Sequence, residues 1–184
     1  MTGPETSPTT PGILTLCTGN AARSVMAGFM FEYLAERGGR PVHIVTAGTH
    51  TVDGQPMSIR TRAALVAIPP LADVPVSRHR SHQLEPADLE SVDVVVAMEA
   101  DHVRYVRRRH PEAAGRTATI RRLVRDLAGG PEPLAERLAR LELATVALSD
   151  DEDVVDPAGG DEATYRACAD QLWSLTQELA PRLF

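Results

Sequence analysis

A cysteine, an arginine and a serine stand together near the start of the chain, in the stretch CTGNAARS at residues 17–24. A cysteine that lies before a helix is close to helix amide groups without partners and to the positive end of the helix dipole, and both stabilise a thiolate. The planar guanidinium of Arg23 can bind two oxygens of a phosphoryl group. Ser24 can donate its hydroxyl to the sulfur. The spacing of Cys17, Arg23 and Ser24 therefore predicts transfer of a phosphoryl group to sulfur.

The residues between Cys17 and Arg23 suit a loop that surrounds an anion with its backbone. Successive amide groups in such a loop form a concave nest for oxyanions. Glycine and asparagine adopt positive φ at the lowest cost, so we expect Gly19 and Asn20 to make the tight turn, and the side chain of Asn20 to orient Ser24. The predicted phosphate-binding residues are Thr18, Gly19, Asn20, Ala21, Ala22, Arg23 and Ser24.

Alternating strands and helices are needed to hold this loop, and the sequence contains the pattern. Apolar runs typical of buried strands predict strands at residues 12–17, 42–48, 92–98 and 117–123. The pattern is weakest in the last of these runs. Apolar residues three and four apart predict helices over residues 26–34, 59–67, 100–110 and 161–179. This order predicts a single-domain α/β fold, a doubly wound parallel sheet of four strands flanked by helices. Such sheets bind ligands beyond the carboxyl ends of their strands, where Cys17 lies.

Length and composition limit the class of protein. A chain of 184 residues with 43% hydrophobic and 24% charged residues is typical of one folded domain. The sequence contains no apolar run near the roughly 20 residues that span a bilayer, so we expect no membrane association. Two cysteines form no disulfide framework and favour a reducing cytoplasm. The net charge of -6 argues against nucleic-acid binding.

The domain is predicted to cover residues 12–184. Residues 1–11 lack the basic and apolar parts of a secretory signal, and we expect them to form a loose tail. A stretch at about 129–150 is interpreted as an inserted helix and loop whose apolar face covers the core, with a cap over the pocket or a contact with a partner as the alternatives. The acidic run SDDED that follows, at residues 149–153, is interpreted as a solvated loop. We expect a monomer or a weak dimer.

The motif Cys-x5-Arg-Ser after an N-terminal strand resembles the phosphate loop of low-molecular-weight protein tyrosine phosphatases. The segments VTAGT, HRSHQL and VDVVVAMEADHVRYV resemble the second strand of that family, the segment after its second helix, and its third strand with the following helix. DVVDPAGGDEATYRACADQL resembles its acid loop and last helix. The resemblance runs from about Ile13 to Leu179. It implies two-step hydrolysis of a phosphate monoester through a cysteinyl phosphate, without a metal or another cofactor.

The resemblance assigns the role of general acid to Asp156. Pro157 restricts the residue before it to extended geometry, and a positioned acid must protonate the leaving group. In the second step Asp156 would act as the base for water. The resemblance also places His79 in support of the phosphate loop, where an ordinary surface histidine is the alternative. His79 and His82 form only a weak metal-binding pattern, and Cys168 is expected to be a core residue of the last helix.

The sequence departs from the family at positions that bear on the substrate. Ala22 stands where a second cysteine is usual, which removes a thiol that commonly shields the nucleophile as a disulfide. Val25 replaces a proline. The two segments that normally supply aromatic walls read THTVDGQPM and DPAGGDEA and contain no aromatic residue. We therefore expect phosphatase chemistry with a weaker or altered preference for phosphotyrosine.

Three classes of function follow from these residues. The first is a phosphatase that acts on phosphotyrosine proteins or on a small phosphorylated metabolite. The second is an arsenate reductase coupled to a small thiol, because the same loop holds arsenate and such an enzyme needs only one cysteine. The third is a phosphate-binding module without activity. It is disfavoured because Cys17, Arg23, Ser24 and Asp156 are all present.

Overall fold

The computed structural model describes residues 10–184, and the predicted tail over residues 1–11 lies almost entirely outside them. Four parallel strands form one sheet in the order β2-β1-β3-β4. They are β1 (Gly12–Cys17), β2 (His43–Gly48), β3 (Val94–Ala97) and β4 (Thr117–Thr119). The predicted α/β fold with four parallel strands is confirmed. The predicted fourth strand was too long, because a helix begins at Ile120, where the side chain of Thr119 caps the first turn.

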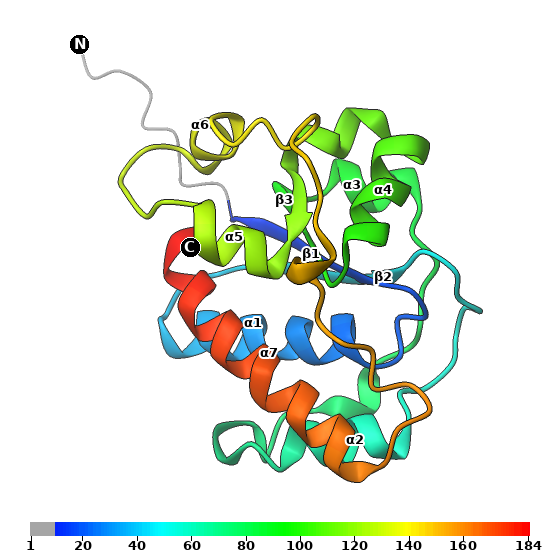
Figure 1. The fold of residues 1–184 in the computed structure, drawn as a ribbon. Helices are drawn as coiled ribbons and strands as arrows, with labels where there is room; N and C mark the ends of the chain where they lie inside the picture. Colours follow the sequence, from blue (N-terminus) through cyan, green and yellow to red (C-terminus); the bar gives the residue numbers. More distant parts are fainter. Residues whose placement is uncertain (1–9) are drawn as a thin grey trace.

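Helices cover both faces of the sheet, with α1 and α7 on one side and α3 and α4 on the other (Figure 1). The helices are α1 (Arg23–Arg37), α2 (Ile59–Val66), α3 (Pro86–Glu90), α4 (Ala100–Arg109), α5 (Ile120–Asp126), α6 (Leu134–Ala139) and α7 (Glu162–Leu183). Short 3-10 turns lie at Pro69–Leu71, Val76–Arg78, Pro111–Arg116 and Asp150–Glu152. None of the helices between residues 10 and 184 is long and apolar enough to cross a membrane.

The central strand β1 is buried on both faces, as a parallel sheet between two helical layers requires. Successive side chains alternate between the faces. Ile13 and Cys17 join the core beneath α1 and α7, whereas Leu14 and Leu16 join the core beneath α3 and α4. Cys17 thus ends the strand at the junction of the core and the loop that follows.

The stretch at residues 129–150 contains α6 and a loop. Leu138 and Leu143 are almost fully buried in the same core as α1 and α7. Its interpretation as an insertion stays a prediction. The following acidic run is not a solvated loop throughout, because Glu152 is only 2% exposed. Sequence reasoning missed this residue since a run of acids predicts solvent exposure unless cations elsewhere in the fold meet it.

Candidate active site

The candidate nucleophile, arginine and acid come together around one small cavity of about 110 Å³. Cys17 ends β1, Arg23 begins α1, and Asp156 belongs to the loop before α7. The cavity is lined by Cys17, Gly19, Ala21, Ala22, Arg23, Ser58, Thr61, Asp156, Ala158 and Tyr165. Segments more than 130 residues apart in the sequence therefore meet at the carboxyl end of the first strand.

Every carbonyl group from Cys17 to Ala21 accepts a hydrogen bond from outside the loop, over 2.7 to 3.0 Å. In chain order the donors are the amides of Thr49 and His50, the hydroxyl of Thr51, Nε2 of His79 and the hydroxyl of Thr61. The amides from Thr18 to Arg23 enter none of the hydrogen bonds found among residues 10–184. No side chain caps α1 at Ala22, and its first turn contains no acid. The loop thus directs its amides and the helix N-terminus toward an anion.

The tight turn of the loop depends on Asn20, which has φ of 45°. The expectation that Gly19 shares this left-handed conformation was wrong, since among the described residues only Asn20 adopts it within the loop. A different glycine makes the loop possible. A Cβ on Gly48, at the end of β2, would lie 2.7 Å from the carbonyl oxygen of Thr18 and 3.1 Å from the amide nitrogen of Asn20. Only a glycine lets β2 approach the loop this closely.

Ser24 links the loop to the sulfur. Its Oγ lies 3.0 Å from Sγ of Cys17, and Nδ2 of Asn20 donates to the same oxygen over 3.0 Å. Oδ1 of Asn20 accepts from the backbone amide of His82, which fixes the orientation of the carboxamide. Because Asn20 supplies a donor to Ser24, the hydroxyl proton of Ser24 is free to point at the sulfur. The carboxamide of Asn20, fixed by His82, thus directs its N–H group at Oγ of Ser24.

His79 lies against the loop and is 8% exposed. Its Nε2 donates to the carbonyl of Asn20, and burial lowers the pKa of His79 below its usual value. His82 contacts Asp88 at 2.9 Å. Between residues 10 and 184 no group of three or more His, Cys, Asp and Glu side chains is arranged to hold a metal ion.

Arg23 is 1% exposed and reaches across the cavity. Its Nη2 donates to Oδ2 of Asp156 over 2.7 Å, and its Nη1 donates to the carbonyl of Val154 over 2.8 Å and to the carboxylate of Glu99. The Asp156 side chain remains 41% exposed at the mouth. The guanidinium is thus held by two carboxylates, one of which lines the cavity.

His102 is a site residue that sequence reasoning missed. The amide of Glu99 donates to its Nδ1, so the proton of the neutral ring is on Nε2, which donates to Oγ1 of Thr18 over 3.0 Å. Burial, with the charge of Arg23 close by, lowers the pKa of His102 to about 4, so the ring is neutral near pH 7. The spacing Glu-x-x-His at the start of a predicted helix is that of a capping box, and this could have signalled it.

The walls of the cavity contain one aromatic side chain, that of Tyr165 in α7. In the structure it packs in the core and also lines the cavity. Three large exposed apolar residues adjoin, along the chain, residues that line the cavity or hold its loop: Val52 at 70%, Ile59 at 87% and Val155 at 72%. Val52 follows Thr51, which holds the loop, while Ile59 and Val155 adjoin the lining residues Ser58 and Asp156.

Comparison with known proteins gives consistent matches. The family described as low molecular weight phosphotyrosine protein phosphatase matches residues 12–135. A protein-arginine-phosphatase from Geobacillus stearothermophilus is 29% identical over 171 residues, which cover 93% of this chain and 95% of that protein. The likeness therefore extends beyond residue 135, through the loop that contains Asp156.

Solved structures agree with this match. A low molecular weight protein tyrosine phosphatase from T. tengcongensis has a TM-score of 0.72 and 28% identity, covering 92% of this chain and 97% of its own. A variant of the arginine phosphatase YwlE with a phosphorylated active-site serine has a TM-score of 0.74 and 26% identity, covering 94% and 95%. These proteins are named for two different phosphorylated residues, arginine and tyrosine.

Proposed function

Because this chain belongs to the low molecular weight phosphotyrosine protein phosphatase family and is a cysteine-dependent phosphatase, we propose that it hydrolyses phosphorylated side chains of proteins, with phosphoarginine as its substrate. One observation carries the chemistry. The loop carbonyls from Cys17 to Ala21 are all held outward, so that amides surround the point above Sγ of Cys17. A phosphoryl group held there has the sulfur on one side and Asp156 at the mouth.

In the first step the sulfur of Cys17 attacks phosphorus. The loop amides and Arg23 bind the phosphoryl oxygens and stabilise the charge that develops on them. The sulfur–phosphorus bond forms as the bond to the leaving group breaks, and protonated Asp156 gives its proton to the departing nitrogen. The products of this step are a cysteinyl phosphate and free arginine on the protein.

In the second step water attacks the same phosphorus. Asp156, now a carboxylate, accepts a proton from the water while the sulfur–phosphorus bond breaks. The sulfur leaves as a thiolate, and the hydroxyl of Ser24 at 3.0 Å stabilises it. Inorganic phosphate is released and both residues return to their starting forms.

The groups at the mouth favour phosphoarginine over phosphotyrosine. An N-phosphorylated guanidinium keeps a positive charge beside the phosphate, whereas a phenol ring is neutral and needs apolar walls. Asp156 lines the cavity, and the carbonyl oxygen of its protonated carboxyl can accept a hydrogen bond from that guanidinium. Tyr165 is the one aromatic side chain in the cavity lining, and residues 49–57 and 156–163 add no Phe, Tyr or Trp to stack on a ring. The arginine-phosphatase name of the Geobacillus stearothermophilus relative supports the same assignment.

The exposed apolar residues Val52, Ile59 and Val155, here called the apolar rim, favour a protein substrate over a small metabolite. They expose apolar surface in three separate segments that contain residues lining the cavity or holding its loop. Apolar surface that gathers around a binding site indicates contact with another macromolecule. A sugar phosphate or a nucleotide offers little apolar surface to such a rim.

Phosphate release from matched substrates tests the proposal. Three substrates are compared by kcat/KM. Two are peptides that differ only at the phosphorylated residue, which is phosphoarginine in one and phosphotyrosine in the other, and the third is a sugar phosphate. We expect kcat/KM for the phosphoarginine peptide to exceed the other two by about tenfold or more. A preference for phosphotyrosine would refute the arginine assignment, and a preference for the sugar phosphate would refute a protein substrate. Thiol-dependent production of arsenite without any phosphate release would establish the arsenate reductase instead.

The remaining expectations stay predictions. Hydrolysis should proceed in the presence of a chelator, because the proposed steps use only side chains and backbone of the chain. A cytoplasmic location, a monomer or weak dimer, and the absence of nucleic-acid binding are predicted from composition and charge alone.

A further inference from the structure

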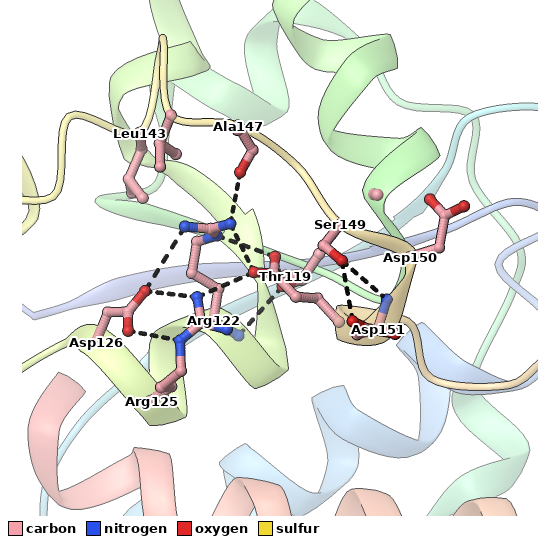
Figure 2. A network of polar contacts seen from close by, with 12 residues as sticks. Thr119, Arg122, Arg125, Asp126, Leu143, Ala147, Ser149, Asp150 and Asp151 are labelled. Carbon is pink, nitrogen blue, oxygen red and sulfur yellow. Dashed lines mark hydrogen bonds and ion pairs between the residues drawn. The ribbon is translucent and has the colours of Figure 1, made fainter.

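Glu152 is a buried carboxylate four residues before Asp156. Its partners come from the end of β4 and from the helix α5 that follows it. The residue is 2% exposed. Oε2 accepts from Nε of Arg122 over 2.9 Å and from the hydroxyl of Thr119 over 3.1 Å. Oε1 lies 2.6 Å from Nη2 of Arg122 and 3.0 Å from Nη2 of Arg125. Figure 2 shows Arg122 and Arg125 extending from α5 into this network.

The two residues after Glu152 are anchored as well. Oδ1 of Asp153 accepts from the amide of Ala100 over 2.7 Å, at the start of α4. The amide of Val154 donates to the carbonyl of Met98 over 2.8 Å, and its carbonyl accepts from Nη1 of Arg23. The chain is thus fixed to α5, α4, the end of β3 and Arg23 just before it reaches Asp156.

The chain beyond Val154 has fewer such anchors. Val155 is 72% exposed and the Asp156 side chain is 41% exposed. The carbonyl of Gly160 accepts from Arg60 at an exposed position. Oδ1 of Asp156 also accepts from the amide of Ala158 over 3.0 Å, within the same loop. The position of the Asp156 carboxyl therefore depends on this local bond, on its bond to Arg23 and on where residues 152–154 are held.

We propose that Glu152 is a positioning residue for the acid step, acting through Asp153 and Val154 on Asp156. A buried carboxylate that meets two arginines holds its segment strongly, and losing one partner leaves uncompensated charge. Proton transfer is sensitive to small displacements, because a misplacement of about 1 Å can cost about a hundredfold in rate. The inference rests on the proposed role of Asp156 in catalysis.

The same network reaches the stretch that precedes the acid loop. Nη2 of Arg122 donates to the carbonyl of Ala147 over 2.7 Å, and Arg107 donates to the carbonyls of Leu143 and Val146. One arginine thus joins Glu152 to the loop after α6.

The test is the dependence of rate on the leaving group, measured with aryl phosphates of increasing leaving-group pKa. Glu152→Gln keeps the shape of the side chain and removes its charge. We expect kcat to fall about tenfold for the poorest leaving group and by less than about twofold for the best. A purely structural role would lower kcat equally for all of them. Asp151→Asn, in the same loop but exposed, is the matched control and should leave the whole series unchanged.

A double variant separates this inference from the proposed function. If Glu152 acts through Asp156, then adding Glu152→Gln to Asp156→Asn should not steepen the leaving-group dependence further. The inference would be overturned if the two substitutions steepened the leaving-group dependence additively. It would also be overturned if Glu152→Gln lowered kcat equally for all leaving groups. If Asp156→Asn itself gives a flat series, the assignment of the acid fails instead. Should Glu152→Gln fail to fold, Arg125→Gln removes a single half-exposed partner, and we expect the same trend at smaller size.

Discussion

Arg23 and Asp156 hold each other across the mouth of the active site, with Nη2 and Oδ2 2.7 Å apart. A phosphate group that binds the guanidinium competes with Asp156 for the same nitrogen. In the proposed mechanism, binding of the phosphate would release the carboxyl toward the leaving group, where a proton donor is needed.

Replacing Cys17 by serine should remove turnover and retain phosphate binding. The loop amides and Arg23 are unchanged, whereas the hydroxyl is a much weaker nucleophile. We expect kcat to fall by about three orders of magnitude or more. The affinity for inorganic phosphate, measured by calorimetry, should change by less than about threefold. Retained turnover would show that another residue attacks phosphorus.

Asp156→Asn should slow the reaction most where the leaving group is poor. The amide cannot donate the proton that a nitrogen or an alkoxide needs, but a good leaving group departs without it. We expect a loss of about a hundredfold or more for the phosphoarginine peptide and about tenfold or less for p-nitrophenyl phosphate. Equal losses for both substrates would contradict the acid role.

Acid should destabilise the protein through His102. Its pKa is about 4 in the fold and about 6.5 in the unfolded chain, so between these values the unfolded chain binds more protons. The free energy of unfolding therefore falls as pH falls through this range, and about 2 kcal/mol from this residue should be lost between pH 7 and pH 5. Burial lowers the pKa of His79 too and acts in the same direction.

Urea unfolding at pH 7 and pH 5 measures this contribution. His102→Gln should be less stable than the wild type at pH 7 and should lose less stability on acidification. His43→Gln, at an exposed position, serves as the control and should follow the wild type. If His102→Gln loses as much stability as the wild type, the pH dependence has another source.

The apolar rim should matter only for protein substrates. Val52→Thr with Ile59→Thr removes apolar surface without touching the lining of the cavity. We expect kcat/KM to fall about three- to tenfold for a phosphopeptide with apolar neighbours, from the value of the apolar area that it buries. For p-nitrophenyl phosphate the change should be less than about twofold. Equal loss for both substrates would place these residues in catalysis rather than in docking.

Peroxide should inactivate this phosphatase without forming a protective disulfide. Ala22 stands in place of a neighbouring thiol, and burial raises the pKa of the Cys168 thiol to about 12, which keeps it protonated. We expect oxidation of Cys17 to proceed to the sulfinic and sulfonic acids, which a thiol reductant does not reduce. Cys168→Ser should leave the recovered fraction unchanged. Full recovery that depends on Cys168 would disprove this.

Local sequence was enough to predict the fold and the phosphate loop. The apolar runs of β1, β2 and β3 and the helical spacing after each of them are short-range patterns. Cys17, Arg23 and Ser24 lie within eight residues, so one turn of chain brings them together. The fourth strand was overestimated because Ile120 continues an apolar run while belonging to a helix capped by Thr119.

Only the tertiary structure decided how the loop is held and where the acid stands. The donors to the loop carbonyls, the neutral His102 beneath Thr18, and Glu152 before Asp156 all lie far along the chain from their partners. An isolated threonine, histidine or glutamate in a sequence does not reveal its partner, because the pairing depends on how β2, α4 and α5 pack around β1. Burial then determines which of these groups are neutral and which must be paired.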